Sequence, residues 1–188
     1  MARSEPTRRI FLIGFMGAGK TSVGRALAAR LGWKFIDLDN VIEAREQATV
    51  AAIFASRGEA EFRRVESAAL QTLLQSNRPA DVAAQSESVV IALGGGTFAQ
   101  AVNRAELDKA GATTVLLQAP LEELRRRCQQ AGSARPLAQD EATFSELFAA
   151  RRQAYELAQY RVDTMGKTVE QVAEEIEHIT SAKLEVKK

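Results

Sequence analysis

Residues Ile10–Thr21 read IFLIGFMGAGKT, and the organisation of the whole chain can be worked out from this stretch. Its apolar beginning predicts a buried strand, and the segment Gly14–Thr21 matches the pattern G-x-x-x-x-G-K-[ST]. An amphipathic helix is predicted directly afterwards, from Lys20 to Leu31. In this context the glycines let successive backbone N–H groups turn inward around a phosphate group. The stretch therefore predicts a phosphate-binding loop between a strand and a helix.

Individual residues of this loop have separate expected roles. The side chain of Lys20 can reach the β- and γ-phosphate oxygens of a nucleotide, and the hydroxyl of Thr21 can bind Mg²⁺. The alternative is a glycine-rich turn with no ligand, which the strand and helix on either side make a poorer explanation. The residues expected to surround the nucleotide phosphates are Gly17, Ala18, Gly19, Lys20, Thr21 and Ser22.

Composition excludes several classes of protein. The chain has 188 residues, of which 46% are hydrophobic and 26% charged, as in one globular domain spanning residues 1–188. Its formal charge of +1 favours neither nucleic acid nor a membrane as partner. A single cysteine, Cys128, and a single histidine, His178, exclude an internal disulfide and a Cys- or His-rich metal site. We expect a cytoplasmic protein with flexible ends at residues 1–8 and 182–188.

Short apolar runs alternate with amphipathic helical stretches along the chain. This alternation is typical of βαβ units, and several runs are too continuously apolar for a sheet with one face in water. The pattern predicts an α/β fold with a mostly parallel sheet covered by helices on both sides. The expected strands are Ile10–Ile13, Lys34–Leu38, Ser88–Leu93, Thr113–Leu117 and Tyr160–Asp163, and residues 131–140 are expected to form a surface loop.

Two carboxylates follow the second predicted strand in the sequence FIDLD. Strand alternation would place Asp37 and Asp39 on one face, and ligands of open α/β sheets bind beyond the carboxyl ends of the strands. Both side chains are therefore candidates for the site that holds the phosphates. The alternative is a helix start, in which Asn40 and Glu43 form a capping box and Asp39 only precedes it.

Further candidates lie in the rest of the chain. Arg63 and Glu66 are three residues apart on a predicted helix, and taken alone they would form an ordinary surface salt bridge. The run Gly94–Gly96 follows a buried strand, where glycine indicates close approach of a ligand or of another backbone segment. Arg135 and Arg151 would each be ordinary solvated charges, although the rigid guanidinium fork suits carboxylate and phosphate groups.

Taken together, the motifs GFMGAGKT, FIDLD, GEAEFRRVE, LGGGT, ARPL and RRQAY make the chain resemble the shikimate kinase family from about Ile10 to about Ile179. The resemblance implies ATP-dependent phosphorylation of the 3-hydroxyl of shikimate in aromatic amino-acid biosynthesis, the chorismate pathway. It also implies the three-layer α/β/α fold of nucleoside monophosphate kinases, with a five-stranded parallel sheet in the order 2-3-1-4-5 and a lid.

The resemblance assigns roles to the candidate residues. Thr21 and Asp37 would serve Mg²⁺, Arg135 would close over the phosphates from the lid loop at residues 131–140, and Glu66 would orient Arg63. Lys20, Asp39 and Arg135 would be catalytic: the two cations neutralise the transferred group, and Asp39 orients the attacking hydroxyl. The residues expected to hold shikimate are Asp39, Arg63, Gly94, Gly95, Gly96 and Arg151.

The adenine contacts stay open at this point. Family members usually carry an arginine seven residues before the lid arginine, where it stacks on adenine. That position is Cys128 in this chain, with Arg127 one place earlier, and Lys167 is a further candidate in the later loop.

Two alternatives to the predicted activity remain. The first is another small-molecule kinase with the same phosphate site, acting on gluconate, a nucleotide or an amino-substituted shikimate. The second is a module that senses ATP without turnover. We expect a monomer whose partners are ATP and shikimate, with neither nucleic acid nor membrane involved.

Overall fold

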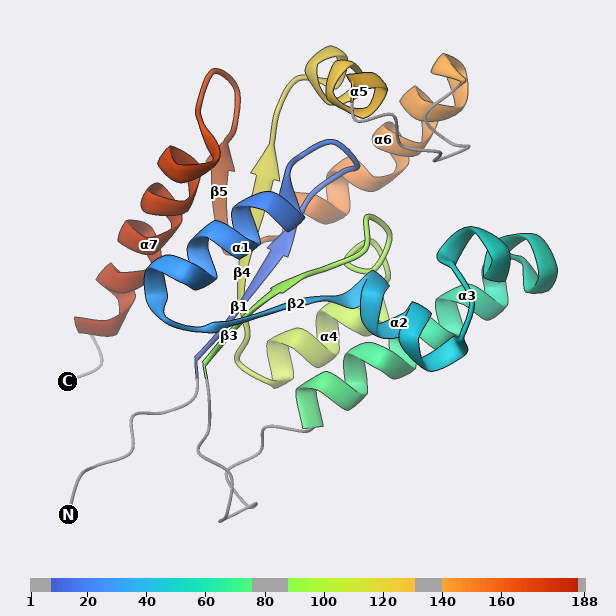
Figure 1. The fold of residues 1–188 in the computed structure, drawn as a ribbon, viewed down its shortest axis with the longest axis horizontal. Coiled ribbons are helices and arrows are strands. Elements are labelled where there is room, and N and C mark those ends of the chain that lie inside the picture. Colours follow the sequence, from blue (N-terminus) through green and yellow to red (C-terminus); the bar gives the residue numbers. More distant parts are fainter. Residues whose placement is uncertain (1–7, 76–87, 131–139, 186–188) are drawn as a thin grey trace.

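A sheet of five parallel strands lies at the centre of the computed structural model, which describes residues 8–75, 88–130 and 140–185 (Figure 1). The strand order is β2-β3-β1-β4-β5, which confirms the predicted α/β fold and its topology. Each predicted strand agrees with the observed one to within a residue at either end. The observed bounds are β1 Arg9–Ile13, β2 Lys34–Asp37, β3 Val89–Ala92, β4 Thr113–Gln118 and β5 Tyr160–Asp163.

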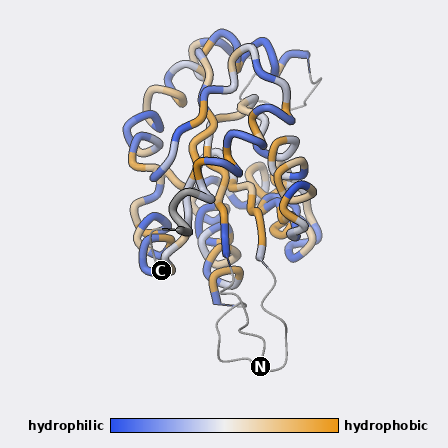
Figure 2. The backbone as a smooth tube through the Cα atoms, turned by 90° about the vertical axis from the view of Figure 1, so that its left-hand side faces the viewer, coloured by the Kyte–Doolittle hydropathy of each residue, from blue (hydrophilic) through white to orange (hydrophobic). Residues whose placement is uncertain are grey.

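The central strand β1 is buried on both faces. Phe11 and Leu12 are fully buried, and Phe11 pairs in register with Ile91 of β3 and Thr114 of β4. A strand with apolar side chains on both faces requires cover from two sides. Figure 2 shows the result, with hydrophobic strands in the middle of the molecule and helices of mixed hydropathy around them.

Helices supply this cover. Helices α1 and α7 pack against each other over one face of the sheet, while α3 and α4 lie over the other (Figure 1). Helices α5 and α6 lie beyond the carboxyl ends of the strands, at the end where α1 begins. The helix bounds are α1 Lys20–Leu31, α2 Leu38–Glu46, α3 Val50–Gln75, α4 Ala101–Lys109, α5 Leu121–Gln130, α6 Glu141–Tyr155 and α7 Val169–Glu185.

The second predicted strand is one residue too long. Strand β2 ends at Asp37, which caps α2 by accepting a hydrogen bond of 3.1 Å from the backbone N–H of Asp39. Asp39 therefore lies in the first helical turn and not on an extended face shared with Asp37, so the alternation predicted for FIDLD is wrong. The predicted capping box is wrong too, because α2 has already begun at Leu38 and Glu43 instead accepts a hydrogen bond from the N–H of Val50. The short carboxylate of Asp37 satisfies an N–H of the first turn, which fixes the helix start three residues earlier than Asn40.

The last helix, α7, continues to Glu185 and so includes the first residues of the segment 182–188, whose flexibility stays a prediction. Within the described ranges, no helix is both long and apolar enough to cross a lipid bilayer.

Candidate active site

The phosphate-binding loop connects β1 to α1 and is tightly packed against its surroundings. Gly17 has φ +80, and a side chain there would overlap the carbonyl oxygen of Leu124 in α5. Only glycine combines this backbone conformation with so close an approach. The Nζ of Lys20 donates hydrogen bonds of 2.9 and 3.1 Å to the carbonyl oxygens of Gly14 and Phe15, so the amine lies over the loop it is expected to serve.

Phe15 attaches the loop to α6. Its ring is buried and meets the rings of Phe144 and Phe148 edge-on, with centroids 4.9 and 5.3 Å away. The guanidinium carbon of Arg151 lies 5.7 Å from the centroid of the same ring. Aromatic pairs of this geometry stabilise a contact by about 0.5–1.5 kcal/mol beyond burial, so the loop and Arg151 are held together by one buried side chain.

A hydroxyl and a carboxylate meet where α1 and β2 approach each other. The Oγ1 of Thr21 donates a hydrogen bond of 2.8 Å to Oδ2 of Asp37. Both are hard oxygen ligands of the kind that Mg²⁺ prefers, so the pair predicted for the metal is brought together and suits it chemically. Among the described residues, no group of three or more His, Cys, Asp or Glu side chains could hold a metal ion. Mg²⁺ is generally bound by one or two carboxylates together with substrate phosphates, and Asp37 beside the phosphate-binding loop fits this mode of coordination.

The triple-glycine turn after β3 is surrounded by side chains that were predicted to hold shikimate. A methyl group on Gly94 would lie 2.9 Å from Oδ1 of Asp39, and one on Gly95 would lie 3.1 Å from Nη1 of Arg151. A methyl group on Gly96 would overlap the guanidinium of Arg63. Side chains from α2, α3 and α6 thus converge on three consecutive residues, which explains why all three are glycine.

The phosphate-binding loop is next to this turn. The carbonyl oxygen of Gly14 lies 3.9 Å from the position that a methyl group on Gly95 would take. The two predicted halves of the site, one for phosphates and one for a small acid, are therefore adjacent at the carboxyl end of the sheet.

Arg63 is held by a buried carboxylate. The side chain of Glu66 is 1% exposed, and its Oε2 accepts a hydrogen bond of 2.8 Å from Nη1 of Arg63. Burial lowers the pKa of Arg63, but the carboxylates of Glu66 and Glu59 raise it by more than burial lowers it. The pKa of Arg63 therefore lies above its ordinary value, and the group stays charged. The interpretation of Arg63 and Glu66 as a surface salt bridge is wrong, because Glu66 is in the interior.

Two donors to Glu66 were not found from the sequence. The hydroxyl of Thr97 donates to Oε1 of Glu66 at 2.6 Å, and the amide of Gln100 donates to Oε2 at 3.0 Å. Three donors on one buried carboxylate leave Arg63 little freedom to rotate away. Thr97 directly follows the glycines in LGGGT, but a threonine in that place carries no signal of its own.

Tyr155 is a third residue without a predicted role. It lies one helical turn after Arg151, and its hydroxyl donates a hydrogen bond to the carbonyl oxygen of Gly95. Burial raises the pKa of Tyr155 to about 12, against the opposing effect of the Arg151 charge. The neutral phenol can therefore hold the glycine turn in place at any physiological pH.

Comparison with known proteins shows the family of the chain. The family model described as shikimate kinase matches residues 16–180. The chain belongs to the shikimate kinase family. It is 40% identical over 172 residues to a shikimate kinase of Geobacter metallireducens, covering 90% of this chain and 89% of that one. It is 43% identical over 159 residues to one of Bordetella pertussis, covering 82% and 70%.

A solved structure of the family gives the same result in three dimensions. Shikimate kinase from Acinetobacter baumannii in complex with shikimate superposes with a TM-score of 0.81 at 34% identity, covering 94% of both chains. The chain is accordingly an enzyme of the shikimate pathway with ATP-using shikimate kinase activity.

This shikimate kinase has a cleft of about 400 Å³ beside the phosphate-binding loop. Gly17 to Gly19 form one wall, α5 contributes Arg127, and Lys167 lies in the loop after β5. Cys128 is instead 5% exposed and packs in the core, so of the two neighbouring candidates only Arg127 faces the cleft. Lys167 lines it as well, with its Nζ paired to Glu175.

The predicted lid residue Arg135 lies outside the described residues, as do residues 131–139 of the predicted loop. The first described residue after them, Asp140, caps α6 by accepting a hydrogen bond of 2.8 Å from the N–H of Thr143.

Proposed function

We propose that this shikimate kinase transfers the γ-phosphoryl group of ATP to the 3-hydroxyl of shikimate across the gap between the phosphate-binding loop and the triple-glycine turn. One observation supports this above all: Arg63, Arg151 and Asp39 converge on Gly94–Gly96, and Gly95 is next to Gly14 of the loop. A substrate with one carboxylate and several hydroxyls needs a cationic fork and a hydrogen-bond acceptor, and both are present here.

The arginines bind the carboxylate of shikimate. Arg63 and Arg151 approach consecutive glycines, so their guanidinium groups can share one small anion. Each is fixed before substrate arrives, Arg63 by Glu66 and Arg151 by packing over Phe15. Fixing these side chains in advance reduces the entropy lost on binding.

Asp39 faces the hydroxyl side of the substrate from the first turn of α2. Its Oδ1 lies beside Gly94, whereas the two arginines lie beside Gly95 and Gly96. There it accepts a hydrogen bond from the ring hydroxyls and orients the one that attacks phosphorus. Phosphoryl transfer depends mainly on such positioning and on charge neutralisation, and little on covalent participation by the protein.

The phosphates of ATP lie on the backbone of Gly17, Ala18, Gly19, Lys20, Thr21 and Ser22. Lys20 leaves the carbonyl oxygens of its own loop and donates to the β- and γ-phosphates. Thr21 and Asp37 would hold Mg²⁺, which when bound neutralises charge on the transferred group. Arg135 of the predicted lid would supply a further positive charge.

A coupled assay of ADP release tests the proposal. The purified protein is given ATP and Mg²⁺ with shikimate, gluconate, a nucleoside monophosphate or an amino-substituted shikimate, and the position of the new phosphate is determined by NMR. We expect shikimate alone to stimulate ADP release and the phosphate to be on the 3-oxygen. Stimulation by another acceptor but not by shikimate would refute the proposal, and ATP binding without transfer to any acceptor would indicate a sensor.

A further inference from the structure

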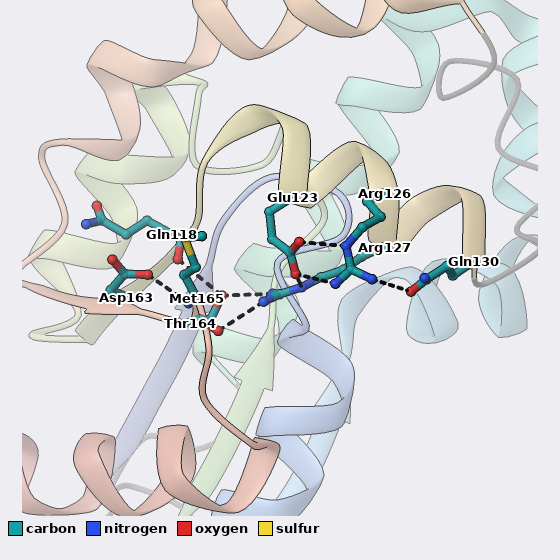
Figure 3. Close-up of polar contacts among 8 residues, drawn as sticks. All are labelled: Gln118, Glu123, Arg126, Arg127, Gln130, Asp163, Thr164 and Met165. Carbon is teal, nitrogen blue, oxygen red and sulfur yellow. Dashed lines mark hydrogen bonds and ion pairs between the residues drawn. The ribbon is translucent and has the colours of Figure 1, made fainter.

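The cleft beside the phosphate-binding loop contains a polar cluster in which Arg127 is the adenine candidate and the other members have no role so far. Its members are Glu123, Arg126 and Arg127 of α5 and Thr164 in the loop after β5 (Figure 3). Glu123 has the central place, because its Oε1 accepts hydrogen bonds of 2.7 Å from both Arg126 and Arg127. The cluster joins two segments that are far apart in the sequence.

Arg127 is fixed at three points of its guanidinium group. Its Nε donates to Glu123, its Nη1 donates to Oγ1 of Thr164 at 2.9 Å, and its Nη2 donates to the carbonyl oxygen of Thr164 at 3.0 Å. Thr164 is itself 3% exposed, and its N–H donates to the carbonyl oxygen of Gln118 at the end of β4. The planar group is thus held between α5 and the edge of the sheet.

This arrangement determines how the guanidinium can be used. Hydrogen bonds donated by guanidinium N–H groups lie in the plane of the group, so the bonds from Arg127 to Glu123 and Thr164 do not use its faces. A planar cation fixed by its edge is suited to stacking on a flat π-system, because its orientation does not have to be established on binding. In this cleft, next to the phosphate-binding loop, the available flat group is the base of the nucleotide.

We propose that Glu123 is a positioning residue for nucleotide binding, which holds Arg127 as a rigid platform under the base, with Thr164 as the second point of attachment. This inference rests on the proposed placement of the nucleotide. Glu123 can do this at all working pH values, since hydrogen bonds from Arg126 and Arg127 lower its pKa to about 2. Arg126 shares the carboxylate but has a side chain that is 54% exposed, so it supports Glu123 from the solvent side.

Binding measurements with three probes test the proposal. ADP and ATP bind both in the cleft that contains Arg127 and at the phosphate-binding loop, whereas inorganic tripolyphosphate binds at the phosphate-binding loop only. Glu123→Ala should weaken ADP binding in calorimetry, and raise the KM for ATP, by about three- to tenfold, the loss expected when one side chain must be ordered on binding. Inhibition by tripolyphosphate, kcat and the KM for shikimate should stay within twofold of the wild type.

Two further variants separate positioning from other effects. Glu123→Gln keeps an acceptor oxygen for Nε of Arg127 and should restore part of the lost ADP affinity. Glu122→Gln is the matched control, because Glu122 is the exposed neighbour on the same helix and loses the same charge. It should bind ADP as the wild type does.

The outcomes that would overturn the proposal are distinct from failure of the proposed function. Unchanged ADP affinity in Glu123→Ala would exclude a positioning role. An equal loss of tripolyphosphate inhibition, or an equal effect of Glu122→Gln, would show a general disturbance of the loop or of charge. A wild-type protein that bound ADP without shikimate-dependent turnover would refute the proposed function, and the ADP comparison would still decide the role of Glu123.

Discussion

Gly96→Ala should damage shikimate binding specifically. None of Gly94, Gly95 and Gly96 has a positive φ, so alanine brings no backbone strain and only the new methyl group matters. At Gly96 that methyl would lie 2.5 Å from the guanidinium carbon of Arg63, and an ordinary contact of about 3.5 Å would require Arg63 to retreat by roughly 1 Å.

The size of the effect follows from this displacement. A misplacement of about 1 Å at a positioning group can lower the rate by about 10²-fold, and loss of one charge-assisted hydrogen bond costs about 1.5–3 kcal/mol. We therefore expect kcat/KM for shikimate to fall by about 10- to 100-fold in Gly96→Ala. The KM for ATP should stay within twofold, because the three atoms nearest to the new methyl all belong to Arg63.

The neighbouring glycines provide graded controls for the same assay. A methyl on Gly95 would lie 3.1 Å from Nη1 of Arg151, a contact that a small shift relieves, so Gly95→Ala should have a smaller effect on shikimate. A methyl on Gly94 would lie 2.7 Å from Oε1 of the buried Glu66 and 2.9 Å from Oδ1 of Asp39, so Gly94→Ala should lower thermal stability as well as turnover. Overpacking of this kind lowers the free energy of unfolding by about 1–3 kcal/mol. In a chain of this size each kcal/mol lowers the melting temperature by roughly 2–4 °C. Equal kinetics in Gly96→Ala and the wild type would refute the placement of Arg63 against the turn.

Further predictions concern the phosphate side and the turn. Lys20→Ala should lower kcat by about 10²- to 10³-fold in steady-state assays, with an unchanged melting temperature; near-normal kcat would exclude the phosphate role. Asp37→Asn should raise the Mg²⁺ concentration that gives half-maximal rate by roughly tenfold. It should preserve stability, because asparagine caps helices as well as aspartate does. An unchanged Mg²⁺ titration would show that Asp37 only caps α2. Tyr155 has its pKa raised to about 12 in the folded state, whereas the unfolded chain loses this proton near its ordinary value, so the unfolding free energy should fall as pH rises through that interval. Denaturant titrations at about pH 9 and about pH 11 should show a smaller decrease for Tyr155→Phe, and an equal decrease would contradict the linkage.

The fold could be predicted from the sequence because local and long-range signals agree. The run Ile10–Ile13 is apolar at every position, and only a central strand covered on both faces accommodates that pattern. The glycine pattern after it has one well-defined structural use, so the start of α1 was equally clear. The strand order came from the resemblance to a family, since periodicity alone does not say which strands are neighbours.

Prediction was weaker where one residue can serve two purposes. Asp37 was expected on a strand, and it both caps α2 and bonds Thr21, because a short carboxylate at a strand end can satisfy a helix N–H and a hydroxyl at once. Thr97 and Gln100 were missed because their role is to donate hydrogen bonds to Glu66, which is 31 and 34 residues away in the sequence. No local pattern encodes such a distance.

The two substrate sites are mechanically joined, and this has a consequence for how the enzyme can change. Phe15 belongs to the phosphate-binding loop but packs on α6, which carries Arg151, and the hydroxyl of Tyr155 on the same helix holds Gly95. A shift of α6 would therefore move a shikimate contact, the glycine turn and the loop together, because interiors packed at crystal-like density transmit displacement. Arg63 reaches the turn from α3, where Glu66 of the same helix holds it, so its own anchor does not belong to α6. Changes in acceptor specificity are thus more accessible through α3 than through α6, where any gain in the acid site would disturb the cradle for ATP.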